Sequence, residues 1–357
     1  MLIGQEQTVY SKGKMILITG SAGFIGSTLC YKLSECGEPF LMLDKLTYAG
    51  HFQNIKSLVD QGIQFVKGDI GDYESNLSLL RKNNVTAVMN LAAESHVDNS
   101  INGPKPFIET NIVGTFSLLE AARSYWSELP QEQKQKFRFL HVSTDEVFGE
   151  LEDSGYFTEK TPYSPNSPYS ATKAASDHLA RAWHKTYGLP VIVTNCSNNY
   201  GPRQFPEKLI PRMIDCALRG EKLPVYGKGQ NVRDWIHVED HASGLMLALK
   251  GAKSGETYCF GGRSERKNIE VVRAICKILD ELKPRFSGSY EEQISFVTDR
   301  AGHDWRYAID DTKAENELSF KRKYTNFEDG LKSTIQWYLA NGEWIEQVKS
   351  RKGMEFL

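Results

Sequence analysis

The chain has 357 residues, 40% of them apolar, and its 43 basic and 45 acidic residues leave a net charge of -2. The length suits one large or two medium domains, and the balanced charge excludes the broad positive field of a nucleic-acid-binding protein. No run of the sequence approaches the roughly 18 apolar residues that a membrane span requires. The six cysteines are scattered and show neither a C-x-x-C motif nor metal-ligand spacing, which indicates reduced thiols in a cytoplasmic protein.

A polar arm, residues 1–14, precedes a short apolar run at Met15–Thr19 that predicts a buried strand. The glycine-rich segment Gly20-Ser21-Ala22-Gly23-Phe24-Ile25-Gly26 follows directly, and Ser27–Glu35 predicts a helix that ends before Gly37. The first glycine permits the turn, the second lets a pyrophosphate reach backbone N–H groups, and the third lets the helix pack on the strand. This spacing is typical of a dinucleotide-binding loop, although structural glycine turns share it.

A second predicted strand, Phe40–Leu43, ends at Asp44. A carboxylate there suits the ribose hydroxyls of NAD and repels the 2′-phosphate of NADP; the alternative is a solvated acidic strand end. A third strand, Ile63–Val66, leads to Asp69, which we expect near the adenine. A fourth, Thr86–Asn90, leads into a segment whose small residues would let a cofactor lie against backbone: Leu91, Ala92, Ala93, Glu94, Ser95 and His96.

Strands and helices alternate through this half of the chain. The alternation predicts an α/β fold, a Rossmann-type doubly wound parallel sheet with helices on both faces. Ligands of such folds bind at the carboxyl ends of the strands, where each motif above is expected. Further along we predict a helix at Asn111–Ala122, a polar connection at Tyr125–Lys136 and a strand at Phe137–Val142.

That strand leads into Ser143-Thr144-Asp145-Glu146, a pair of hydroxyls beside two adjacent carboxyl groups. Within a strand the two carboxylates would point to opposite faces, whereas in a turn at its end both can face a pocket. The pair is unnecessary for simple hydride transfer, but it is useful where a proton leaves one carbon and water leaves its neighbour. An acidic turn that caps the next backbone segment is the alternative interpretation.

The Y-x-x-x-K pattern occurs three times, at Tyr10/Lys14, Tyr156/Lys160 and Tyr169/Lys173. The first lies in the polar arm and the second in a loop. The third follows an N-cap serine and a proline at the first helical position, in a segment that can continue as helix to Tyr187. The i, i+4 spacing puts the Tyr169 phenol and the Lys173 ammonium on one face of the helix. The lysine cation there favours the phenolate form of the tyrosine, which can accept a proton from a hydroxyl group. The alternative is an ordinary tyrosine–lysine pair on the protein surface.

Beyond the tyrosine helix, Leu189–Thr194 predicts another strand, which ends in the polar cluster Asn195–Pro202. From Arg203 onward, proline-containing loops and isolated helices predict a smaller, partly interleaved C-terminal lobe. We expect an NAD-binding domain of residues 15–200 plus about 236–264, and a substrate lobe of about 201–235 plus 265–345. Other elements are expected at Leu209–Leu218, Val238–Lys250, Thr257–Phe260 and Asn268–Lys283.

Two groups of charged or imidazole side chains in this second half are ambiguous. The segment His237–His241 is similar to an H-x-x-E-H metal helix, but it has aspartate in place of the glutamate and no third ligand nearby, so we expect no metal. Four scattered side chains suit a diphosphate clamp or ordinary surface charge: Lys208, Arg233, Arg300 and His303.

Together these residues resemble the extended short-chain dehydrogenase/reductase family, and more closely its dTDP-glucose 4,6-dehydratases, from about Met15 to Asn341. The Ser143–Glu146 run is the specific part of the resemblance, since sugar-nucleotide epimerases of the same fold lack the acidic pair. The other motifs are Gly20–Gly26, Asp44–Thr47, Ala92–Asp98, Tyr169–Lys173, Asn195–Pro202, Phe205–Pro211, Arg233–Trp235 and Asp299–Asp304.

The resemblance implies a dehydration of a nucleotide-linked glucose. Tyr169, assisted by Lys173, would deprotonate the 4-hydroxyl, held by Thr144, while NAD takes the C4 hydride. Glu146 would then remove the C5 proton and Asp145 would protonate the departing C6 hydroxyl. Return of the hydride to C6 gives a 4-keto-6-deoxy sugar, an intermediate in deoxysugar biosynthesis such as that of rhamnose. The cofactor would stay bound throughout.

The resemblance also implies two contact sets and a homodimer. The dimer would form through the Asn111–Ala122 and Tyr169 helices. Contacts with NAD are expected from Gly20, Gly23, Phe24, Ile25, Gly26, Asp44, Lys45, Leu46, Thr47, Asp69, Ile70, Leu91, Ala92, Ala93, Ser95, Thr110, Tyr169, Lys173 and Asn199. Contacts with the sugar nucleotide are expected from Ser95, His96, Thr144, Asn198, Glu207, Lys208, Leu209, Pro224, Tyr226, Arg233, Asn268, Arg300 and His303.

The sequence departs from the family pattern at three places: the extra arm, Phe148 where tyrosine is usual, and Trp305 beside the expected diphosphate site. None removes a catalytic group, but Trp305 leaves the nucleotide preference open. The alternatives are a 4,6-dehydratase or 4-epimerase of a UDP-, CDP- or GDP-sugar, and a redox-sensing protein that binds NAD without catalysis.

Overall fold

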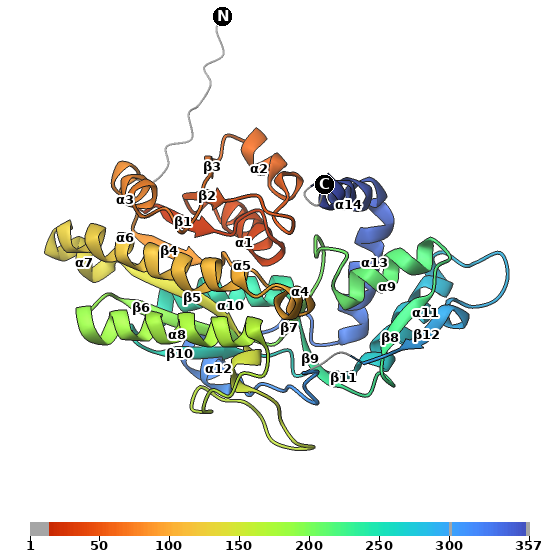
Figure 1. The fold of residues 1–357 in the computed structure, drawn as a ribbon. Helices are drawn as coiled ribbons and strands as arrows, with labels where there is room; N and C mark the ends of the chain where they lie inside the picture. The colour runs from red at the N-terminus through yellow and green to blue at the C-terminus, as the bar shows by residue number, and fades with distance from the viewer. Residues whose placement is uncertain (1–13, 300–301, 355–357) are drawn as a thin grey trace, which may run out of the picture.

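The centre of the molecule is a seven-stranded parallel sheet, seen in a computed structural model that describes residues 14–299 and 302–354 (Figure 1). Its strands are β1 (Ile16–Thr19), β2 (Phe40–Asp44), β3 (Phe65–Lys67), β4 (Ala87–Asn90), β5 (Arg138–Thr144), β6 (Val191–Cys196) and β10 (Thr257–Phe260). They lie in the order β10-β6-β5-β4-β1-β2-β3, and every neighbouring pair is parallel. The predicted doubly wound sheet is confirmed, with its switch point between β1 and β4.

Helices cover both faces of this sheet (Figure 1). One face carries α1 (Phe24–Glu35), α10 (Val238–Gly251) and α12 (Thr312–Leu318), whose apolar side chains share a core with residues of β1, β2 and β4. The other carries α3 (Tyr73–Lys82), α6 (Thr115–Glu128) and α8 (Pro168–Tyr187). Because the strands are apolar on both faces, each face needs such a helical cover.

A second hydrophobic core lies beside the sheet, on the right of Figure 1. Apolar residues on α11 recur at Ile269, Val272, Ile275 and Leu279, so one helix face is buried. This core combines α9 (Leu209–Leu218), α11 (Asn268–Leu282), α13 (Phe327–Ala340) and α14 (Gly342–Met354) with the paired strands β8 (Leu223–Tyr226) and β12 (Ile294–Val297). A three-stranded sheet of β7 (Asn198–Tyr200), β9 (Val232–His237) and β11 (Glu265–Lys267) joins the two cores.

The segment between β4 and β5 differs from the sequence prediction. Short helices α4 (Val97–Asn102) and α5 (Lys105–Phe107) lead into a π-helix, η2 (Ile108–Gly114), before α6 begins. The predicted polar connection is wrong, because α6 continues to Glu128 and α7 (Gln131–Lys136) follows. No side chain of α7 is buried, so it has no apolar periodicity that a sequence pattern could detect.

Two further properties bear on the protein's surroundings. Across residues 14–299 and 302–354, no helix has the length and apolar content that crossing a bilayer would require. All six cysteines are free thiols, and Cys36 alone among them is exposed.

Candidate active site

The glycine-rich segment forms a tight turn between β1 and α1. Gly20 has a φ of +65°, and a Cβ there would lie 2.7 Å from the backbone nitrogen of Ala92. A Cβ on Gly26 would lie 2.0 Å from the carbonyl oxygen of Gly20, so helix and strand pack too closely for any side chain. Gly23 is the N-cap of α1 and provides no side-chain cap, which leaves N–H groups of Phe24 and Ile25 in the first turn available to an anion. The turn therefore fits a pyrophosphate.

Asp44 lies at the end of β2 with its carboxylate held in place. Its two oxygens accept backbone hydrogen bonds from Ala22 at 2.9 Å and Leu46 at 2.7 Å, so the carboxylate has a fixed orientation at the end of β2. Next to it, Lys45 forms an ion pair with Asp69 at 2.7 Å. The predicted residues Asp44, Lys45, Leu46, Thr47 and Asp69 are thus brought together at the ends of β2 and β3.

The loop after β4, residues 91–96, is fixed by Asn111, a residue that our sequence reasoning missed. The Asn111 amide oxygen accepts the Glu94 N–H at 2.9 Å, while its nitrogen donates to the Glu94 carbonyl at 3.0 Å and to the Thr172 hydroxyl at 3.0 Å. Asn111 lies in the π-helix with Thr110, and Gly114 of that helix packs against Ile70. The contacts join the loop holding Leu91, Ala92, Ala93, Ser95 and His96 to helix α8.

The acidic pair lies directly after β5, in the short 3₁₀ turn Asp145–Phe148, so of the two arrangements considered from the sequence the structure has the turn. The Thr144 hydroxyl donates to Asp145 at 3.3 Å and accepts the Glu146 N–H at 3.3 Å. Burial and the neighbouring Glu146 charge raise the pKa of Asp145 well above its ordinary value. Its Oδ2 atom has no hydrogen-bond partner among the described residues, so a protonated carboxyl is available to a ligand.

Tyr169 and Lys173 lie in the first turns of α8. Ser167 and Ser170 form a capping box, Pro168 occupies the first turn, and Gly188 ends the helix in a left-handed conformation, so the predicted helix is confirmed. Burial, and secondarily the Glu146 charge, raises the pKa of Tyr169, while the Thr144 hydroxyl opposes that rise. Without a nearby cation this phenol stays neutral at pH 7.

The Lys173 ammonium donates to the Val142 carbonyl at 2.8 Å, and burial lowers its pKa. One helical turn further, Asp177 is fully buried and supplies an opposite charge. Its carboxylate accepts the Tyr163 hydroxyl at 2.8 Å and lies 3.2 Å from His141 Nε2. Asp177 was missed from sequence, although its i, i+4 spacing from Lys173 was visible.

The loop before α9 contacts the loop after β4. Lys208 donates to the Ser95 carbonyl at 2.8 Å, and Glu207 lies 3.9 Å from His96 and accepts the Tyr48 hydroxyl at 3.2 Å. Leu209 begins α9 directly after Lys208, and Asn198 begins β7. Of these predicted substrate residues, Glu207 and Lys208 contact the loop of residues 91–96 directly.

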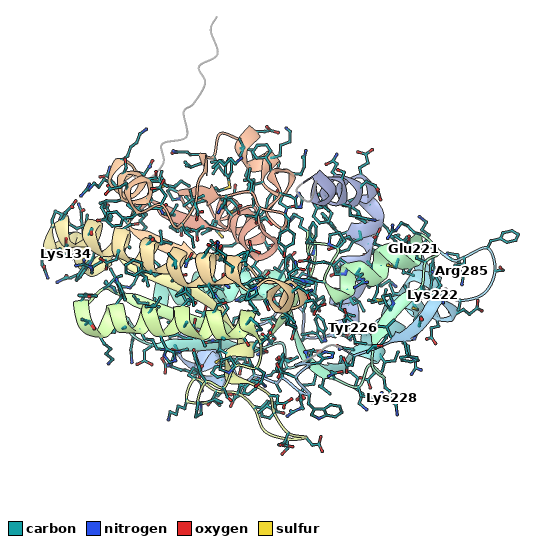
Figure 2. The ribbon with its side chains drawn as sticks, in the orientation of Figure 1. Lys134, Glu221, Lys222, Tyr226, Lys228 and Arg285 are labelled. Atoms are coloured by element: carbon teal, nitrogen blue, oxygen red, sulfur yellow. The ribbon has the colours of Figure 1, made fainter. Side chains whose placement is uncertain are left out.

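A second group of predicted substrate residues meets at the ends of β8 and β9. Tyr226, labelled in Figure 2, donates to Asp98 at 3.2 Å, and its ring lies 6.2 Å from that of His303. His303 contacts Asp299 at 2.6 Å. The Arg233 guanidinium is buried over the Tyr307 ring at 4.3 Å.

Three more predicted substrate residues have different placements. Pro224 lies in β8, and Asn268 begins α11, where its N–H donates to the Asn231 carbonyl. Arg300 lies outside the described residues. For Pro224 and Asn268 the described structure gives a location in the fold and no side-chain hydrogen bond.

Two of the three departures from the family pattern, Phe148 and Trp305, lie within the described residues, whereas the extra arm lies outside them apart from Lys14. Phe148 is buried and stacks on Phe157 at 5.1 Å. Trp305 is 41% exposed; its backbone N–H donates to Glu150 at 2.8 Å and its indole N–H to Asp153 at 3.2 Å. Trp305 thus ties the loop after the acidic pair to the segment that carries His303.

The two histidines of the suspected metal motif have other contacts. His237 caps α10 by accepting the Glu239 N–H at 3.3 Å, and His241 hydrogen-bonds the Asn199 amide oxygen at 2.9 Å. Burial lowers the pKa of His237 to about 4 and that of His241 to about 3. The Asn199 nitrogen donates to the Ser197 carbonyl at 3.0 Å, so this predicted NAD residue is held within the fold.

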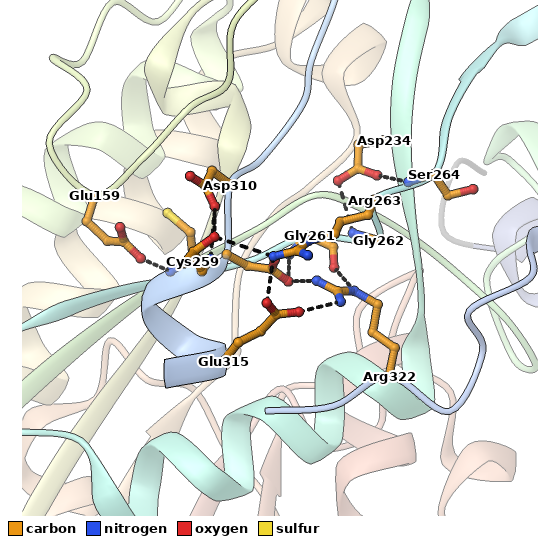
Figure 3. A network of polar contacts seen from close by, with 12 residues as sticks. Glu159, Asp234, Cys259, Gly261, Gly262, Arg263, Ser264, Asp310, Glu315 and Arg322 are labelled. Atoms are coloured by element: carbon orange, nitrogen blue, oxygen red, sulfur yellow. Dashed lines mark hydrogen bonds and ion pairs between the residues drawn. The ribbon is translucent and has the colours of Figure 1, made fainter. Parts of the chain in front are cut away.

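A cluster of ion pairs supports the ends of β9 and β10 (Figure 3). The buried carboxylate of Asp311 pairs with Arg322 and, at 3.0 Å, with Arg263. Glu315 contacts the same two guanidinium groups, at 3.0 and 2.7 Å. Asp234 accepts the N–H groups of Gly262 and Ser264 in the adjoining turn.

Comparisons with known proteins agree with this geometry. A family model described as GDP-mannose 4,6 dehydratase matches residues 17–334. A dTDP-glucose 4,6-dehydratase of Xanthomonas campestris pv. campestris is 56% identical over 334 residues, which are 93% of this chain and 95% of that protein. The crystal structure of a dTDP-glucose 4,6-dehydratase from Streptomyces venezuelae with NAD and TYD bound has a TM-score of 0.84 at 44% identity, covering 94% of this chain and 99% of that one.

The same fold occurs in a UDP-glucose 4-epimerase of Thermus thermophilus in complex with NAD, with a TM-score of 0.80. That protein is 27% identical, over 92% of this chain and 99% of its own. The identity to dehydratases is therefore well above the identity to this epimerase. The chain belongs to the dTDP-glucose 4,6-dehydratases of the extended short-chain dehydrogenase/reductase family.

Proposed function

We propose that this enzyme dehydrates dTDP-glucose to dTDP-4-keto-6-deoxyglucose, with NAD as a resident cofactor. The observation that carries the proposal is the buried Asp145, beside Glu146, at the same strand end as Tyr169 and Lys173. The nucleotide is inferred from the relatives, which are dTDP-glucose 4,6-dehydratases at 44–56% identity.

The residues at the ends of β1 and β2 fit NAD. The uncapped start of α1 suits the pyrophosphate, and the fixed Asp44 carboxylate suits the adenosine ribose. The small residues Ala92, Ala93 and Ser95 would let the rest of the cofactor lie against the backbone of loop 91–96. When bound, NAD supplies an acceptor for the C4 hydride and a donor that returns it at C6.

The protein's own groups move the protons. Tyr169 accepts the proton of the sugar 4-hydroxyl as a phenolate, which the Lys173 ammonium and the positive charge of bound NAD would favour, and Thr144 holds that hydroxyl. Glu146 removes the proton at C5, which the adjacent ketone has acidified. Asp145, kept protonated by its raised pKa, gives a proton to the C6 hydroxyl, which leaves as water.

The second hydrophobic core would form the nucleotide-sugar lobe, with boundaries at about 201–235 and 265–345. Its binding groups would come from two places: Glu207 and Lys208 near loop 91–96, and Tyr226, Arg233 and His303 at the ends of β8 and β9. Charged and aromatic groups of this kind suit a diphosphate and a base.

We further infer a cytoplasmic homodimer. Apolar side chains remain exposed along η2, α6 and α8 in the single chain: Ile108 (47%), Val113 (51%), Phe116 (43%) and Tyr187 (47%). A second copy would cover them. Six free thiols fit a reducing compartment. The product would enter deoxysugar biosynthesis such as that of rhamnose.

The test is incubation with dTDP-glucose, and separately with UDP-, CDP- and GDP-glucose, without added reductant or cofactor. We expect a 4-keto-6-deoxy product, seen by mass loss of one water, and the highest kcat/KM with dTDP-glucose. Release of the 4-epimer would favour the epimerase alternative. No dehydrated product from any of the four would contradict the proposal.

A further inference from the structure

The C-terminal helix α14 reaches the glycine-rich turn through two hydrogen bonds. The indole N–H of Trp344 donates to the side-chain oxygen of Asn54 at 2.8 Å. The amide nitrogen of Asn54 donates to the carbonyl of Ala22, also at 2.8 Å. Ala22 lies between Gly20 and Gly23, and its own N–H is the one that holds Asp44.

This path is buried along its whole length. Asn54 is 1% exposed, Trp344 is 9% exposed and Ala22 is fully buried. In Figure 1, α14 is the dark blue helix beside α1 and α2 (Lys56–Asp60). A hydrogen bond in such a place is costly to lose, because no water replaces the missing partner.

The helix is anchored on the second core. Ile345 and Val348 are buried in that core, and Lys349 forms an ion pair with Asp215 of α9 at 2.9 Å. Trp344 packs against Trp337 of α13, with ring centroids 5.2 Å apart. The packing of α14 against the second core therefore holds the Trp344 indole N–H in place beside Asn54.

The direction of these bonds matters for the turn. A side-chain amide can rotate by 180°, exchanging its oxygen and nitrogen. Because the Trp344 N–H requires an acceptor, it fixes the oxygen of Asn54 toward α14 and the nitrogen toward Ala22. The reversed amide would set two oxygens against each other at Ala22 and disturb the peptide that leads into Gly23.

We propose that Trp344 is a positioning residue for the NAD site, acting through Asn54 on the Ala22 carbonyl. Together with the His51 N–H, which donates to the same carbonyl at 3.0 Å, this path keeps the Ala22 carbonyl turned away from the start of α1, where a pyrophosphate would meet N–H groups. The second core thereby contributes to cofactor retention. This inference rests on the proposed function, since it requires NAD at the glycine-rich turn.

The experiment compares Trp344→Phe with Trp337→Phe, a matched control that also removes an indole beside the same core. The Trp337 indole N–H has no hydrogen-bond partner within residues 14–299 and 302–354. The amount of NAD retained after gel filtration is measured by nucleotide release, and the NAD dissociation rate is followed well below the unfolding temperature of each variant. We expect about three- to tenfold faster dissociation for Trp344→Phe, the range for one lost hydrogen bond, and less than about twofold for Trp337→Phe.

A double-mutant cycle with Asn54→Ala separates positioning from packing. If Trp344 acts through Asn54, adding Trp344→Phe to Asn54→Ala changes the dissociation rate no further. Equal rates for the two Phe variants, or full additivity in the cycle, would overturn the inference. A wild-type protein that binds no NAD would instead contradict the proposed function.

Discussion

The side-chain amide of Asn111 lies 3.0 Å from the hydroxyl of Thr172, joining the π-helix η2 to the helix that carries Tyr169 and Lys173. The same amide holds both backbone groups of Glu94. One buried side chain therefore sets the distance between the loop after β4 and the tyrosine helix.

We expect Asn111→Ala to lower kcat by about tenfold or more, because reacting groups lose their relative placement. It should also lower the free energy of unfolding by about 1–3 kcal/mol, since the backbone of Glu94 loses its two hydrogen bonds with the Asn111 amide. Thr172→Val removes one of the three contacts and should have a smaller effect on both. Steady-state kinetics and urea denaturation check this, and equal losses in the two variants would contradict it.

Asp145→Asn combined with Glu146→Gln should separate oxidation from dehydration. Tyr169 and Lys173 remain, so reduced cofactor should still accumulate and be seen by its absorbance after mixing with dTDP-glucose. Loss of the acid and the base should slow product formation by about 10²-fold or more. Tyr169→Phe is the control and should suppress both signals. Unchanged turnover in the double variant would show that other residues carry the elimination.

The cluster in Figure 3 contains two arginines with the same acidic partners and different burial. The Arg322 side chain is 9% exposed and that of Arg263 is 48% exposed. Arg322→Met should lower the free energy of unfolding by about 3–5 kcal/mol, because the fully buried Asp311 carboxylate loses its buried partner. Arg263→Met should cost about 0–1 kcal/mol. Chemical denaturation measures both, and similar losses would argue against burial as the cause.

Stability should fall in mild acid because His241 is buried in its neutral form, with a pKa lowered to about 3. In the unfolded chain the His241 imidazole takes up a proton near pH 6.5, whereas in the folded chain it stays neutral until the pH approaches 3. The contribution of neutral His241 to the free energy of unfolding is therefore complete above pH 6.5 and declines as the pH falls toward 3. The decline is about 1.4 kcal/mol per pH unit for one histidine.

The free energy of unfolding, measured by urea denaturation between pH 8 and pH 5, tests this assignment to His241. His241→Gln should lose stability less steeply than the wild-type protein as the pH falls. His178 is exposed on α8, and His178→Gln should follow the wild-type slope. A wild-type slope in the His241 variant would contradict the assignment.

Features with local signals could be predicted from the sequence. The glycine turn, Asp44 after its strand, and the helix from Pro168 to Tyr187 depend on neighbours within a few residues, and the structure confirms their placement. Asn111 and Asp177 were missed because their partners lie on other elements.

Helix α7 was missed for a different reason. It buries no side chain, so its sequence resembles that of a polar loop. The roles assigned to the substrate residues remain predictions, since they depend on how loops from both cores close around a ligand.

The strand order has a consequence for how the protein is made. Strand β10 completes the sheet by pairing with β6, yet β7, α9, β8, β9 and α10 are synthesised between them. During synthesis on the ribosome, the edge of β6 that later pairs with β10 therefore stays unpaired until that whole intervening stretch has emerged. A fragment that stops before Thr257 would keep this edge open and be prone to aggregate through it, which makes the chain poorly suited to division into separately expressed halves.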